Sequence, residues 1–148
     1  LDTIINKLIG KQQTGFLKGR NIAFVHRQID DMLTIHRQSK RAGILLAIDF
    51  KQAFDAINIP CILKSLELFG FGPRFINWIK ILNTERIFSV KNGGHISQTF
   101  GMHNGVRQGC PISPHFFILS AEVLAQKIIQ DKNIVGLKTN NNIRLKVI

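Results

Sequence analysis

The stretch GILLAIDFKQAFDAI, from Gly43 to Ile57, decides how the rest of the chain is interpreted. It contains a continuous aliphatic run, Ile44 to Ile48, which is too short for an ordinary helix and predicts a strand buried on both faces. Asp49 follows directly, and a carboxylate at the end of a buried strand costs free energy unless a cation, such as a divalent metal, receives it. The alternative is that Asp49 caps a helix that begins in AFDAI, residues 53–57. The spacing alone favours neither interpretation.

The composition indicates a basic globular domain. A length of 148 residues fits one domain or a piece of a larger protein, and a hydrophobic content of 45% is enough for a core. The chain has 20 Lys and Arg against 9 Asp and Glu, which gives a net charge of +11. This charge predicts a polyanionic partner, with nucleic acid ahead of a membrane surface. A basic surface that binds nothing is the alternative.

The cysteines and the ends of the chain suggest an intracellular fragment. Cys61 and Cys110 have no CxxC spacing, so we expect neither a zinc site nor a disulfide partner, and a reducing interior follows. No signal-peptide layout and no run long enough to cross a bilayer is present, so no membrane partner is expected. The chain begins at Leu1 and ends on an apolar run from Leu145 to Ile148, so both ends look truncated.

Apolar periodicity and turn residues predict an α+β fold, with helices packed on a small, largely antiparallel sheet. A hairpin is expected over residues 86–100, turning at 92–94, and a second over 134–148, turning at 140–142. The basic loop 11–20 either grips phosphates or is a solvated connector. Helices are expected over residues 1–9, 22–40, 60–69, 73–84 and 113–130.

Five segments, taken in order, resemble one family. IDFKQAFD at 48–55 and GVRQGCPISPHFFILSAEVLAQKI at 105–128 are the strongest pair. QTGFLKGR at 13–20, FGFGPRFINWI at 69–79 and VKNGG at 90–94 fit the same family in the same order. Together they resemble the reverse transcriptases of non-LTR (LINE-type) retrotransposons, and more distantly those of group II introns. The resemblance covers nearly the whole chain, and it implies an RNA-directed DNA polymerase.

The resemblance also implies a right-hand polymerase fold, with about residues 1–42 as fingers and palm-proximal helices and about 43–148 as palm. Asp49 matches the first catalytic aspartate, which would bind magnesium (or manganese) together with the backbone carbonyl of Phe50 in a two-metal nucleotidyl transfer. The implied partners are an RNA template, a DNA primer and deoxynucleoside triphosphates. By the same analogy, the location would be nuclear.

Further site residues follow from the same resemblance. Phe54 matches a steric gate, whose bulky ring rejects a 2′-hydroxyl, although from the residues alone it reads as a core aromatic. Gln108 and Gly109 match a second palm motif, where the glycine lets the backbone approach the nascent base pair and the glutamine lies beside the incoming nucleotide. Arg107 and Arg20 are candidates for contacts with phosphate or template.

Departures from the family pattern restrict the expected activity. Asn104 stands where the family usually has Arg, and no Trp follows the first motif. The finger segment with a triphosphate-binding Arg and the YADD-type hairpin with two more carboxylates are both missing. One carboxylate cannot hold two metals, so we expect the chain alone not to polymerise. It would be a fragment of a polymerase, a non-catalytic nucleic-acid-binding remnant of a decayed retroelement, or a structural protein whose motifs are only core and turns.

Overall fold

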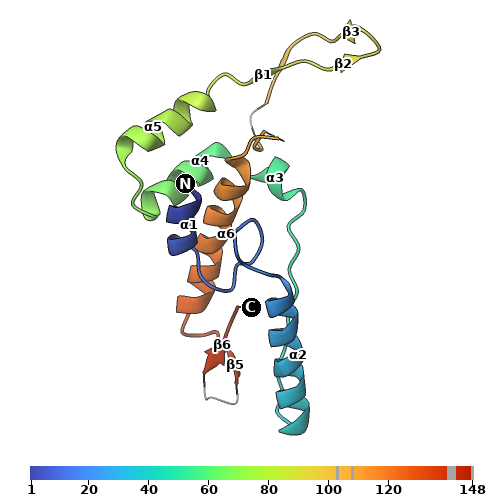
Figure 1. Cartoon of the computed structure of the whole chain (residues 1–148), viewed down its shortest axis with the longest axis vertical. Helices are drawn as coiled ribbons and strands as arrows, with labels where there is room; N and C mark the ends of the chain where they lie inside the picture. Colours follow the sequence, from blue (N-terminus) through green and yellow to red (C-terminus); the bar gives the residue numbers. More distant parts are fainter. Residues whose placement is uncertain (103, 108, 140–142, 148) are drawn as a thin grey trace. The chain divides into compact units, whose positions relative to one another are not determined.

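The computed structural model describes residues 1–102, 104–107, 109–139 and 143–147 (Figure 1). The chain divides into two compact units. The terminal unit consists of Leu1–Asp49 and Ala121–Ile148, and the central unit is Phe50–Ser120. Helix α6, Ser113–Gln130, contributes residues to both units.

The terminal unit contains helices α1 (Asp2–Leu8) and α2 (Ala23–Gln38), the second part of α6, and a short antiparallel pair of strands. Strand β5 (Leu137–Lys138) pairs with β6 (Arg144–Leu145), with Leu137 opposite Leu145. The side chain of Asn21 accepts a hydrogen bond of 2.9 Å from the backbone of Ala23 and so satisfies a free donor at the start of α2. The buried apolar residues of this unit are Ile5, Ile9, Leu17 and Met32.

The described residues of the central unit form three helices, two short antiparallel pairs of strands and the first part of α6. The helices are α3 (Ala53–Ala56), α4 (Ile59–Leu68) and α5 (Pro73–Leu82). Strand β1 (Ile87–Phe88) pairs with β4 (Phe100–Gly101), and β2 (Lys91–Asn92) pairs with β3 (His95–Ile96). Its buried apolar residues are Ile62, Leu66, Ile79, Val106, Phe116, Ile118 and Leu119.

Local chemistry explains where these elements begin and turn. The Asn58 side chain accepts a hydrogen bond of 2.8 Å from the backbone of Cys61 and caps α4. Pro73 occupies the first position of α5, where its missing N–H costs nothing. Gly93 (φ 56°) and Gly94 (φ 87°) form the tight turn between β2 and β3.

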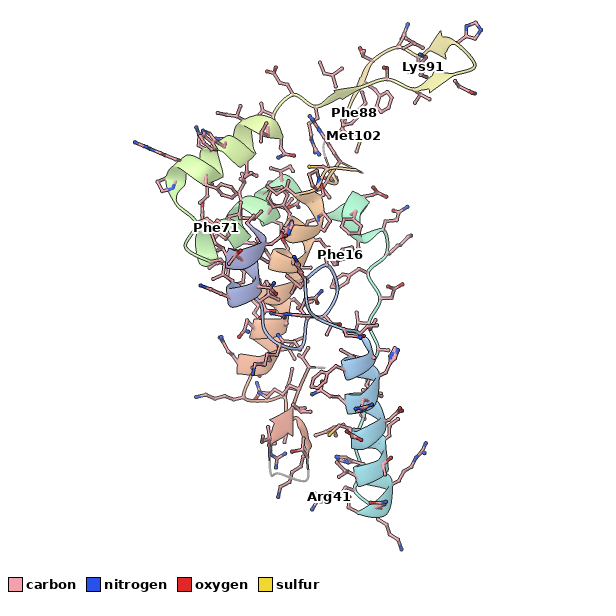
Figure 2. All side chains as sticks on the ribbon, viewed as in Figure 1. Phe16, Arg41, Phe71, Phe88, Lys91 and Met102 are labelled. Atoms are coloured by element: carbon pink, nitrogen blue, oxygen red, sulfur yellow. The ribbon has the colours of Figure 1, made fainter. Side chains whose placement is uncertain are left out.

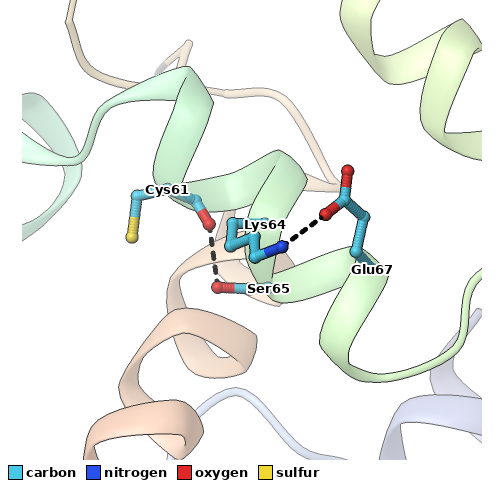
Figure 3. Close-up of polar contacts among 4 residues, drawn as sticks. All are labelled: Cys61, Lys64, Ser65 and Glu67. Atoms are coloured by element: carbon cyan, nitrogen blue, oxygen red, sulfur yellow. Dashed lines mark hydrogen bonds and ion pairs between the residues drawn. The ribbon is translucent and has the colours of Figure 1, made fainter.

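Polar contacts on α4 show how its two faces differ (Figure 3). On the buried face, Ser65 Oγ donates to the carbonyl of Cys61 over 2.9 Å. The same hydroxyl lies 3.3 Å from Ser120 Oγ on α6. On the exposed face, Lys64 and Glu67 form an ion pair of 3.0 Å. Such an exposed pair contributes little to stability, so α4 is held mainly by its apolar face.

The prediction of an α+β fold with antiparallel pairing is confirmed, and in the described parts of the chain the strands form three separate two-stranded ladders. The five predicted helices are observed within about two residues of their expected positions. The turn at residues 140–142 lies outside the described residues. No described helix has both the length and the apolar composition needed to cross a bilayer.

The predicted buried strand over Ile44 to Ile48 is wrong. These residues have no regular secondary structure, and Ile44 is 87% exposed and Leu46 74%. A strand buried on both faces needs neighbouring strands, and no described segment forms backbone hydrogen bonds with this run. The alternative that Asp49 caps the next helix is also wrong, because Gln52 occupies the N-cap position of α3 and no side chain caps it.

Candidate functional site

The two motif segments at residues 48–55 and 105–128 meet in the central unit. The backbone N–H of Val106 donates to the carbonyl of Phe54 over 2.8 Å, and that of Gly105 donates to the carbonyl of Ile57 over 2.7 Å. Asn58 and Asn104 form an antiparallel bridge beside these bonds. A strip of the loop before α6 therefore lies against α3 in a strand-like arrangement, although the two are far apart in sequence.

Gly105 makes this close approach possible. Its φ is +83°, and a Cβ added to it would lie 3.0 Å from the carbonyl oxygen of Asp55 and 3.2 Å from that of Phe54. Any other residue would be strained in φ and would also push the loop away from α3. The sequence did not predict a special role for this glycine, because its partner carbonyls are not visible from local sequence.

A pocket of about 480 Å³ lies at this junction. Its volume is in the range of small-molecule sites. Three of the predicted site residues, Phe54, Arg107 and Gly109, line it together. Gln108, which was predicted to act beside Gly109, lies outside the described residues. The remaining lining residues are Gln52, Ala53, Asp55, Val106, Cys110, Ser113 and Pro114.

The ring of Phe54 has packing partners as well as a place in the pocket wall. Its centroid lies 5.3 Å from that of Phe117 on α6, with the ring planes at 43°. Phe50 meets the same Phe117 ring edge-on, at 5.6 Å and 90°. Pairs at these separations stabilise each other beyond simple burial. The core-aromatic and pocket-wall interpretations of Phe54 are therefore compatible.

The loop that carries Arg107 and Gly109 is anchored to the start of α6. The buried hydroxyl of Ser113 donates to the carbonyl of Arg107 over 3.0 Å, and the backbone N–H of Cys110 donates to the same carbonyl over 3.2 Å. The Arg107 side chain itself is exposed, with its guanidinium carbon 6.0 Å from the centroid of Phe88. Gly109 has a φ of +79°, and a Cβ added there would meet nothing within 4 Å, so conformation is what requires glycine at this position.

Arg86 is a site residue that the sequence predicted only as part of a strand. It is 4% exposed, and its Nη1 donates to the carbonyl of Gly105 over 2.5 Å. Its Nε is buried and has no hydrogen-bond partner among the described residues. Burial, and secondarily the charge of Arg107, lower the pKa of Arg86 below its usual value.

Arg20, in the terminal unit, organises the end of α1. Its guanidinium donates to the backbone carbonyls of Asn6 and Ile9, both at 3.0 Å, to that of Gln13 at 2.7 Å and to that of Gly10. These acceptors include carbonyls that the end of a helix leaves without intrahelical partners. The structure thus gives Arg20 a structural role, and its contact with template stays a prediction.

Asp49 and Phe50 are exposed, so both can be approached from solvent. Within the described ranges, no three His, Cys, Asp or Glu side chains lie together in a way that could hold a metal ion. Mg²⁺ requires near-octahedral oxygen coordination, and Asp49 offers one carboxylate. Asp49 belongs to the terminal unit, whereas the pocket lies in the central unit.

Comparisons with known proteins agree with the motifs. Residues 1–142 match the family described as reverse transcriptase (RNA-dependent DNA polymerase). The chain is 27% identical over 82% of its length to the transposon TX1 uncharacterized 149 kDa protein of Xenopus laevis. It is 26% identical over 89% of its length to the retrovirus-related Pol polyprotein from type-2 retrotransposable element R2DM of Drosophila melanogaster. It is 24% identical over 68% of its length to the corresponding type-1 R2 polyprotein of Popillia japonica.

The chain spans only 9%, 12% and 16% of the lengths of the TX1, R2DM and type-1 R2 relatives, respectively. The match to the family nevertheless covers almost all of its 148 residues. The resemblance to non-LTR retrotransposon reverse transcriptases is thereby confirmed. The chain belongs to the reverse transcriptase (RNA-dependent DNA polymerase) family.

Proposed function

We propose that this chain supplies the nucleotide-selecting part of an RNA-directed DNA polymerase from a non-LTR retroelement. The observation that carries the proposal is the pocket at the junction of α3 and the loop before α6, where Phe54, Arg107 and Gly109 meet. In this proposal the chain forms most of a polymerase palm and part of the fingers, within a much longer protein.

The proposed substrates are deoxynucleoside triphosphates, added to a DNA primer on an RNA template. Phe54 would reject ribonucleotides by occupying the volume of a 2′-hydroxyl, and its contact with Phe117 supports a fixed position of the ring. Gly109 and Gln108 would lie beside the new base pair. The net charge of +11 favours binding of the nucleic-acid backbone, to which Arg107 would contribute. A nuclear location is part of the same proposal.

In the proposal, Asp49 and the backbone carbonyl of Phe50 contribute oxygen ligands for Mg²⁺, with Mn²⁺ as a substitute. Divalent metals in nucleotidyl transfer activate the attacking hydroxyl and neutralise charge on the phosphates. Waters and substrate phosphates usually complete the coordination of Mg²⁺. The family resemblance implies two further carboxylates for the second metal, and in this proposal they come from elsewhere in the longer protein. We therefore propose that the 148 residues by themselves do not polymerise.

Primer extension tests the proposal. The isolated chain, given primer–template, deoxynucleotides and Mg²⁺, should yield no product. A protein expressed from the whole open reading frame that carries this chain should extend the primer, and Asp49→Ala should abolish the extension. Product from the isolated chain would contradict the need for further carboxylates. Full activity of the Asp49→Ala protein would contradict the catalytic role of Asp49.

A non-catalytic nucleic-acid-binding remnant is the second candidate function. It is favoured by the net charge of +11, which suits binding to a polyanion. Both candidates predict binding to a primer–template duplex that weakens steeply as salt rises, because bound counterions are released. Only the first candidate, the polymerase function, predicts that the protein expressed from the whole reading frame extends the primer. Binding that does not depend on salt would contradict both candidates.

A further inference from the structure

Arg86 holds the loop before α6 at two points. Its own backbone carbonyl accepts a hydrogen bond of 3.1 Å from Met102, next to the pairing of Ile87 with Gly101. Its side chain donates to the carbonyl of Gly105 over 2.5 Å. Phe88 and Met102 mark this region in Figure 2. Arg86 is thus hydrogen-bonded to both Met102 and Gly105.

A series of hydrogen bonds links the Arg86 side chain to the backbone that lines the pocket. Gly105, which accepts from Arg86, donates in turn to Ile57, and its neighbour Val106 donates to Phe54. The space beside Gly105 is already filled by Asp55 and Phe54 backbone atoms. A shift of Gly105 would therefore displace the backbone of Phe54 and, with it, the Phe54 side chain.

Burying the Arg86 guanidinium at this position costs free energy, so a specific interaction must offset that cost. It is almost fully desolvated and lies close enough to Arg107 for the two like charges to disfavour each other. A neutral apolar side chain would avoid that cost but would leave the carbonyl of Gly105 without this donor. A lysine keeps the charge but lacks the planar fork of donors that holds a fixed direction.

We propose that Arg86 is a positioning residue for sugar selection: by holding Gly105 it keeps the loop against α3 and so fixes Phe54 in the pocket. This inference rests on the proposed function of Phe54. Arg86 need not contact the nucleotide, because its effect reaches the pocket through Gly105, Val106 and the backbone of Phe54. We therefore expect substitution of Arg86 to change the selectivity for deoxynucleotides over ribonucleotides without loss of the fold.

Hydrogen exchange in the isolated chain tests the structural part of this inference. In Arg86→Lys, the amides of Gly105 and Val106 should exchange about tenfold faster, because one charged hydrogen bond that holds them is lost. The amides of α5 should be unchanged. Arg74→Gln, which alters an exposed arginine on α5, is the matched control and should leave Gly105 and Val106 as they were. Unchanged exchange of both amides in Arg86→Lys would overturn the inference.

Sugar discrimination tests the functional part, in the polymerase expressed from the whole reading frame. The measurement is the ratio of kcat/KM for a deoxynucleotide to that for the matching ribonucleotide. Phe54→Ala should lower this ratio by about tenfold or more. Arg86→Lys should lower it in the same direction by a smaller factor, with its Tm within a few degrees of the parent.

The two tests separate failure of this inference from failure of the proposed function. If Phe54→Ala lowers the ratio and Arg86→Lys leaves it unchanged, the positioning role is overturned and the role of Phe54 stands. If Phe54→Ala leaves the ratio unchanged, the proposed gate is rejected, and sugar selection through Arg86 is rejected with it. In that case the exchange of Gly105 and Val106 still decides whether Arg86 holds the loop.

Discussion

The backbone N–H of Val106 donates to the carbonyl of Phe54 over 2.8 Å, and this bond joins the two motifs on which the proposed function depends. It belongs to a short strand-like contact that also includes the bond from Gly105 to Ile57. The contact explains why residues so far apart in sequence line one pocket. It also identifies the positions where a small change should have a large and local effect.

Gly105→Ala should destabilise the central unit more than a conformational cost alone predicts. The left-handed φ costs an alanine about 1–2 kcal/mol. The contact of the new Cβ with Asp55 at 3.0 Å should add about 1–3 kcal/mol, since neither backbone can easily move. The free energy of unfolding in urea measures the sum.

Gly70→Ala is the matched control for this prediction. Gly70 also has a positive φ, +75°, but nothing lies within 4 Å of its Cβ position. It should therefore show the conformational cost alone. Equal losses of stability in Gly70→Ala and Gly105→Ala would mean that the loop is not in close contact with α3.

Much of the fold was predictable because its causes are local. The start of α4 at Asn58, the start of α5 at Pro73 and the turn at Gly93 and Gly94 all depend on residues within one turn of the feature. The run Ile44 to Ile48 was not predictable in the same way. Its aliphatic pattern shows only that the run could be buried in a sheet, whereas its actual burial depends on neighbouring strands that are distant in sequence.

The candidate site was predicted in part, for a related reason. Phe54, Arg107 and Gly109 were found by resemblance to a family, and the structure places them around one pocket. Gly105 and Arg86 were missed, because their importance lies in contacts with backbone atoms distant in sequence. A glycine or an arginine gives no sign of such a partner in a single sequence.

Phe54 and Phe117 should be energetically coupled. A double-mutant cycle with Phe54→Leu and Phe117→Leu should give a coupling of about 0.5–1.5 kcal/mol in unfolding free energy, as expected for aromatic rings at 5.3 Å. A control cycle pairs Phe54→Leu with Phe75→Leu, whose ring stacks on Phe71. That cycle should be additive. Equal coupling in the two cycles would indicate a general loosening rather than a direct contact.

Arg20→Lys should destabilise the terminal unit by roughly 1.5–3 kcal/mol, because a lysine cannot donate to four carbonyls around the end of α1. Urea unfolding measures the loss. Lys18→Ala, which removes an exposed cation from the same loop, should change stability by less than about 0.5 kcal/mol. If Arg20→Lys kept full stability but bound primer–template more weakly, the predicted template contact would be favoured over the structural role.

Asp49→Asn should separate stability from activity. The carboxylate is exposed, so in the isolated chain the change should alter the unfolding free energy by less than about 0.5 kcal/mol. In the protein expressed from the whole reading frame, the same change removes the proposed charged metal ligand, and the proposal expects primer extension to fall by orders of magnitude. A large loss of stability in the isolated chain would show that Asp49 has a structural partner, and would weaken the case for keeping this aspartate free for a metal.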